Sequence, residues 1–285
     1  MKIIQYKDLT PELARAGCFV LNMPNDAYHA YEGISKSGLD LINKSPLHYL
    51  AGVKPKSKRH LELGTALHTA VLEPVRFKSE YMILAGVKVR TASEYKSAVK
   101  ANGSERVLTE TEGANLVSTQ EAIQSDPVLA AELAACDLFE LSAFIEIDGV
   151  LCRCRYDALK SKDLISIDLK TTQCSDREDF AKSVYNYRYH VQAAFYSDIF
   201  CRITGAPLKA FKFLAVENEP PHCPMLYTLD DEALIIGAAV MAENMEAYAH
   251  ADKYSNWFGY EQTNEPLSLP GWALARHENE LEILC

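Results

Sequence analysis

The middle of the chain alternates apolar and polar residues. Residues 138–147 and 164–170 follow this period of two, which puts successive side chains on opposite faces of a strand. Asp148-Gly149 directly follows the first run, and this dipeptide is a strong hairpin signal. A polar stretch at 160–163 separates the later runs. The pattern predicts three consecutive strands, at residues 138–147, 150–159 and 163–172.

Other segments show helical spacing or clear boundary signals. Residues 60–73 predict a helix, and Thr109 with Glu112 predicts a capping box. Ser35 or Ser37 can cap a short helix, and Pro46 can open the next one. Further helices are expected at 91–101, 108–124, 127–135, as a pair within 176–204, and at 230–254. Further strands are expected within 77–89, 207–217 and 223–229, whereas 1–34 is expected to be largely irregular, with at most one short strand.

These elements, without repeats or an evident linker, predict one α/β domain over residues 1–285. Its core is expected at about 28–254, with a peripheral C-terminal segment at 255–285. The composition, 48% hydrophobic and 24% charged, is that of an ordinary globular protein. No apolar run approaches the ~20 residues that span a bilayer, and the N-terminus lacks the apolar core of a signal peptide. We therefore expect a cytoplasmic protein without membrane contact.

Net charge and cysteine spacing limit which ligands the protein can bind. The net charge of −10 argues against a general polyanion binder, so any path for DNA must be confined to a small part of the surface. The eight cysteines form no Cys-x2-Cys pair, which argues against a zinc ribbon. Cys152 and Cys154 share one strand face and are expected to be buried free thiols.

The strand pattern brings charged residues together. Asp168 and Lys170 share one face of their strand, and Asp157 shares a face with Arg153 and Arg155. If the two strands pair, then Asp157, Asp168 and Lys170 converge. Two carboxylates can hold Mg²⁺, the backbone carbonyl of Leu169 can add an oxygen, and the ammonium of Lys170 can polarise the attacking water or stabilise transition-state charge. An isolated Asp-x-Lys is more often a surface ion pair of little energy, but the spacing to Asp157 favours a site.

Two helices add candidates. Gly64 and His68 lie four residues apart on one helix face, as do Gln192 and Tyr196. Glutamine and tyrosine can contact phosphates or bases, although packing alone would also explain this helix. Ser35 and Ser37 could hold a phosphate at a helix N-terminus, but plain capping explains them equally well. The basic run at 54–60 is a further candidate for phosphate contact.

In this order, Gly64-x3-His68, Asp157, Asp168-x-Lys170 and Gln192-x3-Tyr196 resemble the RecB-like branch of the PD-(D/E)xK nucleases. The fuller sequence resembles the nuclease domains of the exonuclease VIII (RecE-type) family of prophage recombination systems. The matching segments cover most of residues 28–205: YHAYEGISKSGLDLINKSPLHYL, LELGTALHTAVLEP, FELSAFIEIDGVLCRCRYDAL, ISIDLKTT and YHVQAAFYSDI.

The resemblance implies a restriction-endonuclease-like core, a mixed central sheet flanked by helices, with extra N-terminal and C-terminal helices. It implies a Mg²⁺-dependent exonuclease that degrades the 5′ strand of linear duplex DNA and leaves 3′ overhangs for recombination. It also implies a ring-shaped homo-oligomer, expected to be a tetramer, and a single-strand annealing partner of the RecT type. Alternatives on the same core are a structure-specific endonuclease and an inactive module that binds DNA ends.

By this resemblance His68, Asp157 and Asp168 are metal ligands and Lys170 is the catalytic lysine. Gln192, Tyr196 and Glu140 are expected to support the site or the DNA, and Arg153 and Arg155 to face the DNA. A histidine ligand makes Mn²⁺ a suitable substitute for Mg²⁺. No iron–sulfur cluster is expected, because only Cys223 and Cys285 lie late in the chain. The long N-terminal region of larger members is lacking, which indicates a short phage version or an excised domain.

Overall fold

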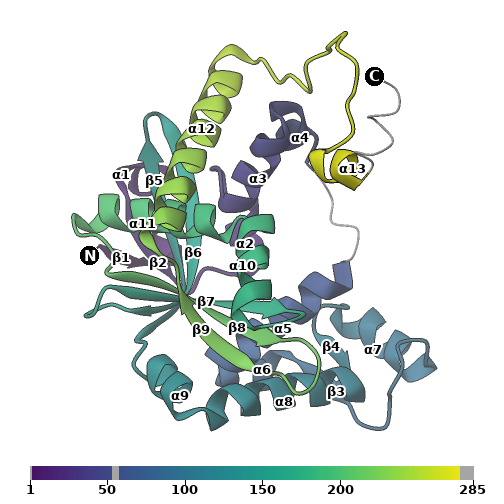
Figure 1. Ribbon diagram of the computed structural model, residues 1–285. Coiled ribbons are helices and arrows are strands. Elements are labelled where there is room, and N and C mark those ends of the chain that lie inside the picture. Colours follow the sequence, from purple (N-terminus) through teal and green to yellow (C-terminus); the bar gives the residue numbers. More distant parts are fainter. Residues whose placement is uncertain (1, 53–57, 277–285) are drawn as a thin grey trace.

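The computed structural model describes residues 2–52 and 58–276 and is built on a mixed seven-stranded sheet (Figure 1). The strand order is β1-β2-β5-β6-β7-β8-β9. The β1–β2 and β7–β8 pairs are parallel, and the other neighbours are antiparallel. The strands are β1 (Ile3–Gln5), β2 (Cys18–Leu21), β5 (Leu138–Ile147), β6 (Val150–Lys160), β7 (Ile165–Thr172), β8 (Ala210–Glu217) and β9 (Pro224–Thr228).

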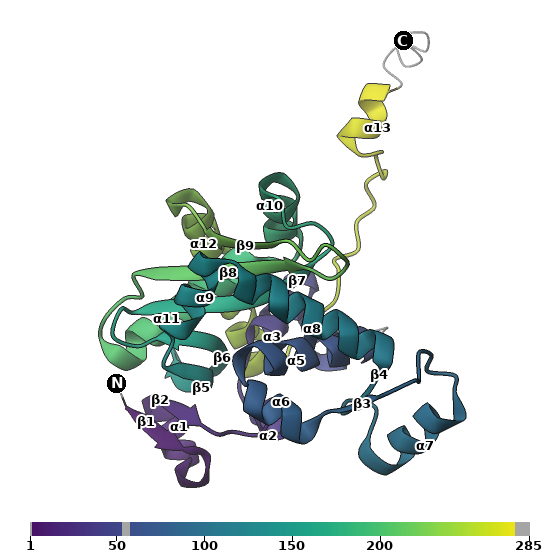
Figure 2. The same ribbon diagram turned by 90° about the horizontal axis from the view of Figure 1, so that it is seen from below.

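Helices cover both faces of this sheet (Figures 1 and 2). The cluster on one side includes side chains of α3 and α11, and α12 lies over α11. The cluster on the other side includes side chains of α5, α8 and α9. The bounds are α3 (Lys36–Lys44), α4 (Pro46–Ala51), α5 (Lys58–Leu72), α8 (Glu110–Ser125), α9 (Pro127–Ala134), α10 (Arg177–Asn186), α11 (Tyr189–Thr204) and α12 (Asp231–Tyr254). The expected α/β fold with a helix-flanked mixed sheet is confirmed.

The three central strands are those that the alternation predicts. Asp148 and Gly149 both have positive φ, 51° and 82°, as a two-residue primed turn between β5 and β6 requires. The β6–β7 ladder is short and pairs residues 158–160 with 165–167 only. Beyond this ladder the two strands diverge into a fork, and Asp157 and Asp168 are the first residues on either side of it.

The N-terminal segment is more ordered than expected. Residues 3–21 contribute β1 and β2 to the central sheet, with α1 (Pro11–Ala16) and a short 3-10 helix (Tyr6–Asp8) between them, and α2 (Asn25–Ala30) follows. The expectation that residues 1–34 are largely irregular, with at most one short strand, was therefore wrong. These strands are three and four residues long, and β2 forms by pairing with distant β5. Such contacts leave little local pattern.

A second, two-stranded parallel sheet lies beside α5. It joins β3 (Met82–Leu84) to β4 (Val107–Thr109), with α6 (Pro74–Glu80) and α7 (Ser93–Asn102) around it. The expected strand within 77–89 is thus preceded by a helix, which Pro74 opens at its first position.

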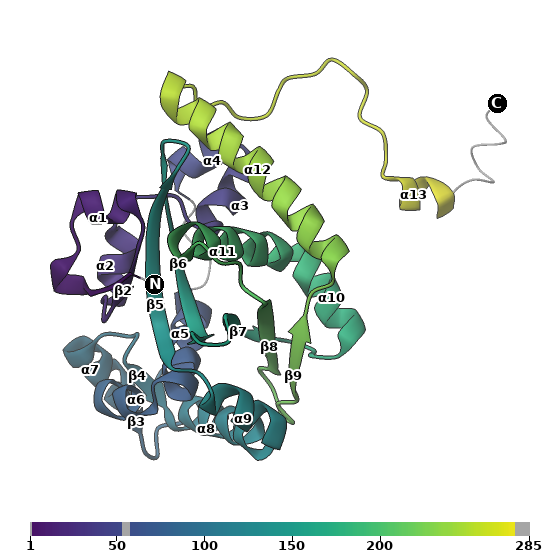
Figure 3. The same cartoon turned by 90° about the vertical axis from the view of Figure 1, so that its left-hand side faces the viewer.

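The described part of the C-terminal segment, residues 255–276, lies at the periphery. Residues 255–276 are mostly exposed, include the short α13 (Gly271–Arg276), and run away from the body of the protein (Figures 1 and 3). Near its start this segment contacts α4, where Phe258 accepts a backbone hydrogen bond from Leu47. Across residues 2–52 and 58–276, no helix combines the length and apolarity needed to cross a membrane.

Candidate metal centre

The fork between β6 and β7 positions two carboxylates. Asp157 Oδ2 accepts the backbone N–H of Leu169 at 2.8 Å, which ties the two strands together at the point where their ladder ends. Asp157 and Asp168 are 9% and 2% exposed. Such burial of two acids is costly unless hydrogen bonds, a cation or protonation compensates it.

A third carboxylate comes from β5. Glu140 faces Asp157 in the β5–β6 register, yet these two residues are skipped in the ladder although the pairs on both sides form. Glu140 has a φ of 47°, a left-handed conformation that is uncommon for a residue with a side chain and often marks a functional site. The backbone is therefore distorted where the Glu140 carboxylate approaches Asp157.

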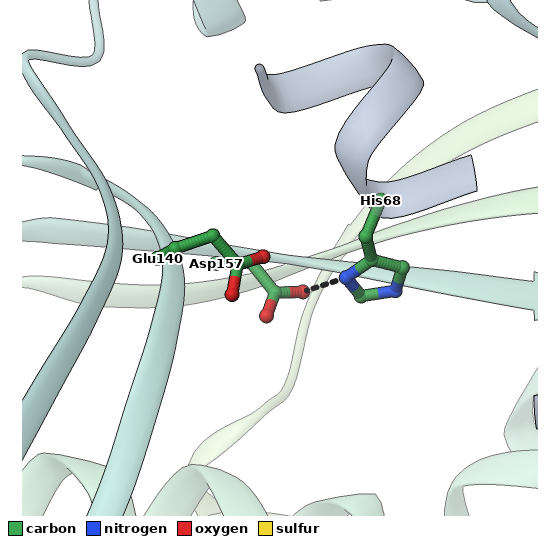
Figure 4. A group of neighbouring side chains, drawn as sticks. All are labelled: His68, Glu140 and Asp157. Atoms are coloured by element: carbon green, nitrogen blue, oxygen red, sulfur yellow. Dashed lines mark ion pairs between the residues drawn. The ribbon is translucent and has the colours of Figure 1, made fainter. Parts of the chain in front are cut away.

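Helix α5 adds an imidazole. His68 Nδ1 lies 3.3 Å from Asp157 Oδ2, and one ligand atom from each of His68, Glu140 and Asp157 can be chosen so that all three lie within 4.8 Å of one another (Figure 4). The apolar residues Ala66 and Leu67 of this helix pack into the cluster beneath the sheet. This packing fixes the face of α5 that carries His68.

Asp168 has different partners. Gln192 of α11 donates from Nε2 to Asp168 Oδ1 at 2.5 Å, and the Lys170 ammonium lies 2.6 Å from Oδ2. Oδ2 is buried and accepts no well-aligned hydrogen bond within the described part of the chain; the ion pair with Lys170 is its close contact. Lys170 Nζ also lies 4.8 Å from the centre of the Tyr189 ring.

This arrangement shifts the pKa values of the buried acids and of Lys170. Burial and the neighbouring Asp168 raise the pKa of Asp157 to about 7, against a weaker opposing effect of His68. Burial likewise raises the pKa of Glu140. Burial alone would lower the pKa of Lys170, but Asp168 and Asp157 outweigh it and raise that pKa. Lys170 therefore stays cationic. Arg155 Nη1 lies 3.8 Å from Glu140 Oε2, yet burial outweighs this cation and keeps the pKa of Glu140 raised.

The donor set fits a divalent cation. Carboxylate oxygens suit Mg²⁺ and Mn²⁺, and an imidazole suits transition metals. His68, Glu140 and Asp157 could hold such an ion, with Asp168 Oδ2 as a further oxygen beside them. Glu140, expected only as a supporting residue, thus lies with the candidate ligands.

The cluster opens into a cleft. A cavity of about 610 Å³ is lined by the start of α3, one face of α5 and the acidic cluster. A cavity of about 560 Å³ on the other side of His68 includes Lys170 and Tyr189. Leu169, proposed as a carbonyl ligand, borders this second cavity. A Cβ on Gly64 would meet no atom within 4 Å, so this glycine leaves the floor of the first cavity open to a ligand.

Five other predicted residues also line the first cavity: Ser35, Ser37, Tyr196 and the two arginines Arg153 and Arg155. Ser35 accepts a hydrogen bond from Gly38 N at 3.4 Å, which confirms its role as a helix cap. Ser37 borders the cavity beside it. Tyr196 borders it as well, but its ring packs edge-on against Tyr156, with ring centres 5.4 Å apart, and is therefore fixed by packing.

Arg153 and Arg155 are bound by groups of the protein itself. Arg155 donates to Ser142 Oγ at 2.9 Å and to the Met23 carbonyl at 2.9 Å, and its side chain is 10% exposed. Arg153 donates to the carbonyls of Gly33 and Tyr28 at 3.0 and 2.9 Å. Both guanidinium groups hold the N-terminal segment against β6. Both also line the first cavity, so their expected contact with DNA stays a prediction. The alternation along β6 correctly placed both arginines on the strand face of Asp157. It did not predict that the N-terminal segment covers this face.

Sequence analysis missed Lys36 and Tyr189. Lys36 is bound to Asp40 at 2.7 Å and to the Tyr187 carbonyl at 2.5 Å, and its ammonium lies 5.8 Å from the centre of the Tyr189 ring. Tyr189 therefore has Lys36 and Lys170 beside it. The position of Lys36 between Ser35 and Ser37 was the available signal. Most of the basic run at 54–60 lies outside the described residues.

Comparison with known proteins agrees with this fold. The fold is of the PD-(D/E)xK class. Residues 35–264 match the family described as a PDDEXK-like domain of unknown function (DUF3799), and the chain belongs to this family. No curated protein matches.

Solved structures extend the comparison. A crystal structure described as “Putative exonuclease” from Eubacterium rectale superposes with a TM-score of 0.61 at 13% identity, over 90% of this chain and 98% of the other, which shows a shared fold. The protein VC1899 from Vibrio cholerae gives a TM-score of 0.21 at 12% identity, over 78% of this chain and 57% of the other, too low for an argument.

Proposed function

We propose that this protein is a Mg²⁺-dependent exodeoxyribonuclease of the RecE type, which degrades the 5′ strand of linear duplex DNA and leaves 3′ overhangs for recombination. The observation that carries the proposal is the acidic cluster with His68 at the fork, beside the Asp168–Lys170 pair. Family membership supports nuclease chemistry, and the sequence resemblance supports the polarity.

The chain's residues divide into two groups by what they can do. His68, Glu140 and Asp157 can bind a divalent ion, because their ligand atoms come together. Such an ion, when bound, lowers the pKa of a water and neutralises phosphate charge. Gln192 orients Asp168 through Oδ1. Lys170, held cationic by its two acidic neighbours, can orient the attacking water or stabilise charge that develops on the phosphate.

Linear and covalently closed duplexes of the same sequence, each incubated with Mg²⁺ or Mn²⁺, test this proposal. Loss of a 5′ label from the linear duplex, with the 3′-labelled strand left as an overhang and closed circles intact, is the expected outcome. Efficient cutting of closed circles would favour a structure-specific endonuclease. Binding to ends without hydrolysis in either metal would favour an inactive end-binding module.

A closed ring of identical subunits, by resemblance a tetramer, completes the proposal. A chain of charge −10 should dissociate readily from DNA if it bound as a monomer, whereas a ring encloses the duplex and retains it topologically. A single-strand annealing protein of the RecT type would receive the overhang. Light scattering tests the ring, because a monomer that digests processively would contradict it.

A further inference from the structure

One part of this acidic protein carries the opposite charge. Residues 74–109, which form α6, β3, α7 and β4 and are called the basic wing here, contain seven lysines and arginines against three glutamates. Their net charge is +4, whereas the whole chain carries −10. Figure 2 shows the wing at the edge of the molecule, with α7 projecting beyond α5 and α6.

Several cations of the wing are available to a ligand. Lys88, Lys96 and Lys100 are exposed and form no ion pair with any described residue. A basic surface is often only solvated, and ion pairing within the protein would neutralise it. These three lysines are not neutralised in this way. At physiological salt, charges beyond ~8 Å are largely screened, so the acidic remainder of the chain does not cancel their local field.

The wing is fastened to the helix that carries His68. Arg59 of α5 donates to the carbonyls of Ser104 and Val107 at 2.6 and 2.9 Å, and its Nε donates to Glu112 at 3.0 Å. Ser104 Oγ in turn donates to Glu62 of α5 at 2.7 Å. Because these groups are at most partly exposed, their hydrogen bonds fix the wing relative to α5.

The wing is attached to α5 a short distance from His68. Arg59 lies nine residues before His68, which is ~14 Å along an α-helix and corresponds to about four base pairs at 3.4 Å each. His60 and Gly64 lie between Arg59 and His68 on α5, and both line the cleft. A duplex that places a phosphate at His68 and continues along α5 would therefore reach the wing within half a helical turn.

We propose that the basic wing binds the phosphate backbone of duplex DNA several base pairs away from the cleaved bond. Lys88, Lys96 and Lys100 supply the contacts. This inference rests on the proposed nuclease function and adds where the duplex is held. It also explains how a chain of such negative charge approaches DNA, since binding is confined to one positive region.

The test compares two triple variants with the same change in charge. Lys88→Gln/Lys96→Gln/Lys100→Gln alters the wing, and Lys7→Gln/Lys162→Gln/Lys209→Gln alters three exposed lysines elsewhere. Both are made in an Asp168→Asn background, which prevents cutting during binding. Fluorescence anisotropy with a labelled duplex of about 24 base pairs is then measured over a range of KCl concentrations, after melting curves confirm folding.

The slope of log K against log salt concentration is negative, and each lost phosphate contact makes it less steep by ~0.9. The slope of the wing variant should therefore be less steep by about 2 to 3, and its affinity at low salt should be at least about tenfold lower. The slope and affinity of the control triple should stay near those of the parent. Equal slopes and affinities for the two triples would overturn the proposal.

A small substrate separates this inference from the proposed function. Bis(p-nitrophenyl) phosphate is too short to reach from the cleft to the wing. With Asp168 intact and Mn²⁺ present, the wing triple should hydrolyse it as fast as the unmodified chain, and a loss of this hydrolysis would contradict a binding role remote from the site. If the unmodified chain hydrolyses no DNA, the nuclease proposal fails, whereas the salt slopes still decide whether the wing binds DNA.

Discussion

Asp157 and Asp168 face each other across one strand fork but have contrasting surroundings. Asp168 has a partner at each oxygen: the amide of Gln192 donates to Oδ1, and the ammonium of Lys170 forms an ion pair with Oδ2. Asp157 has one backbone donor, and its other neighbours include Glu140 and His68. The protein therefore supplies countercharge to one carboxylate and leaves the other near a second acid.

This difference indicates a division of labour. Asp168 is held in one orientation before any ligand arrives, which is how outer partners fix metal-site carboxylates. Asp157 and Glu140 are costly as a charged pair, since burial raises the pKa of both. A bound cation would remove that cost. Metal binding is therefore expected to stabilise the Asp157 side of the fork most.

Removing Asp157 should have the largest effect. Asp157→Ala takes away a candidate ligand and the partner of His68. Turnover on linear duplex should fall by more than the ~10²–10³ typical of losing one electrostatic group, and Mn²⁺ affinity by calorimetry should fall with it. Asp163→Ala, at an exposed position on the same hairpin, is the matched control. Retained metal affinity in Asp157→Ala would contradict the assignment.

Lys170→Met should separate chemistry from metal binding. The ammonium contacts Asp168 and is kept cationic by both acids, so its loss should lower turnover by ~10²–10³. Mn²⁺ should still bind, because no ligand atom is removed. If turnover at saturating metal were normal while metal affinity disappeared, Lys170 would be a structural counter-ion instead.

The stability of the metal-free protein should depend on the charge of Asp157. Its folded-state pKa of about 7 exceeds the ordinary 3.8, so its contribution to stability is fully present below about pH 4 and is lost as the pH rises through 7. Asp157→Asn cannot ionise. In chelator at about pH 8 it should be more stable than the parent by roughly 2–4 kcal/mol.

Melting curves across pH check this sign. The advantage of Asp157→Asn should shrink as the pH falls toward 4 and should reverse when Mg²⁺ is added at high pH. Asp163→Asn should show neither trend. A parent that is as stable as Asp157→Asn at every pH in chelator would mean that the carboxylate is not strained by burial.

Gln192→Leu should have the smallest effect on the site. It removes the donor to Asp168 Oδ1 and leaves the charges unchanged. Loss of such an outer partner typically costs ~10–100-fold in metal affinity or activity. Tyr196→Phe, one turn along α11, is the control for packing. Unchanged kinetics in Gln192→Leu would show that Asp168 needs no orienting partner.

The fork could be predicted from sequence because its signals are local. Strand alternation gives the faces of Asp157, Asp168 and Lys170, and Asp148-Gly149 gives the hairpin before them. The left-handed backbone at Glu140 has no comparable signal. Its approach to Asp157 depends on a local break in the β5–β6 ladder, so sequence analysis gave Glu140 only a supporting role.

The environment of the two arginines could not be predicted for a related reason. Arg153 and Arg155 share a strand face with Asp157, as the period of two requires. Their partners are carbonyls about 120–130 residues earlier in the chain, in a segment with weak local pattern. Long-range contacts of this kind, which anchor the N-terminal segment, leave no signal in the local pattern of residues.

The central claim is that a divalent ion binds on the Asp157 side of the fork. Anomalous scattering from a crystal soaked in Mn²⁺ tests it most directly. We predict a peak bounded by His68, Glu140 and Asp157, and no such peak in a crystal of Asp157→Ala. A second group, Cys174, Asp176 and Asp179, also brings ligand atoms within 4.8 Å of one another but is more exposed. A manganese peak at that group, with none beside Asp157, would contradict the account.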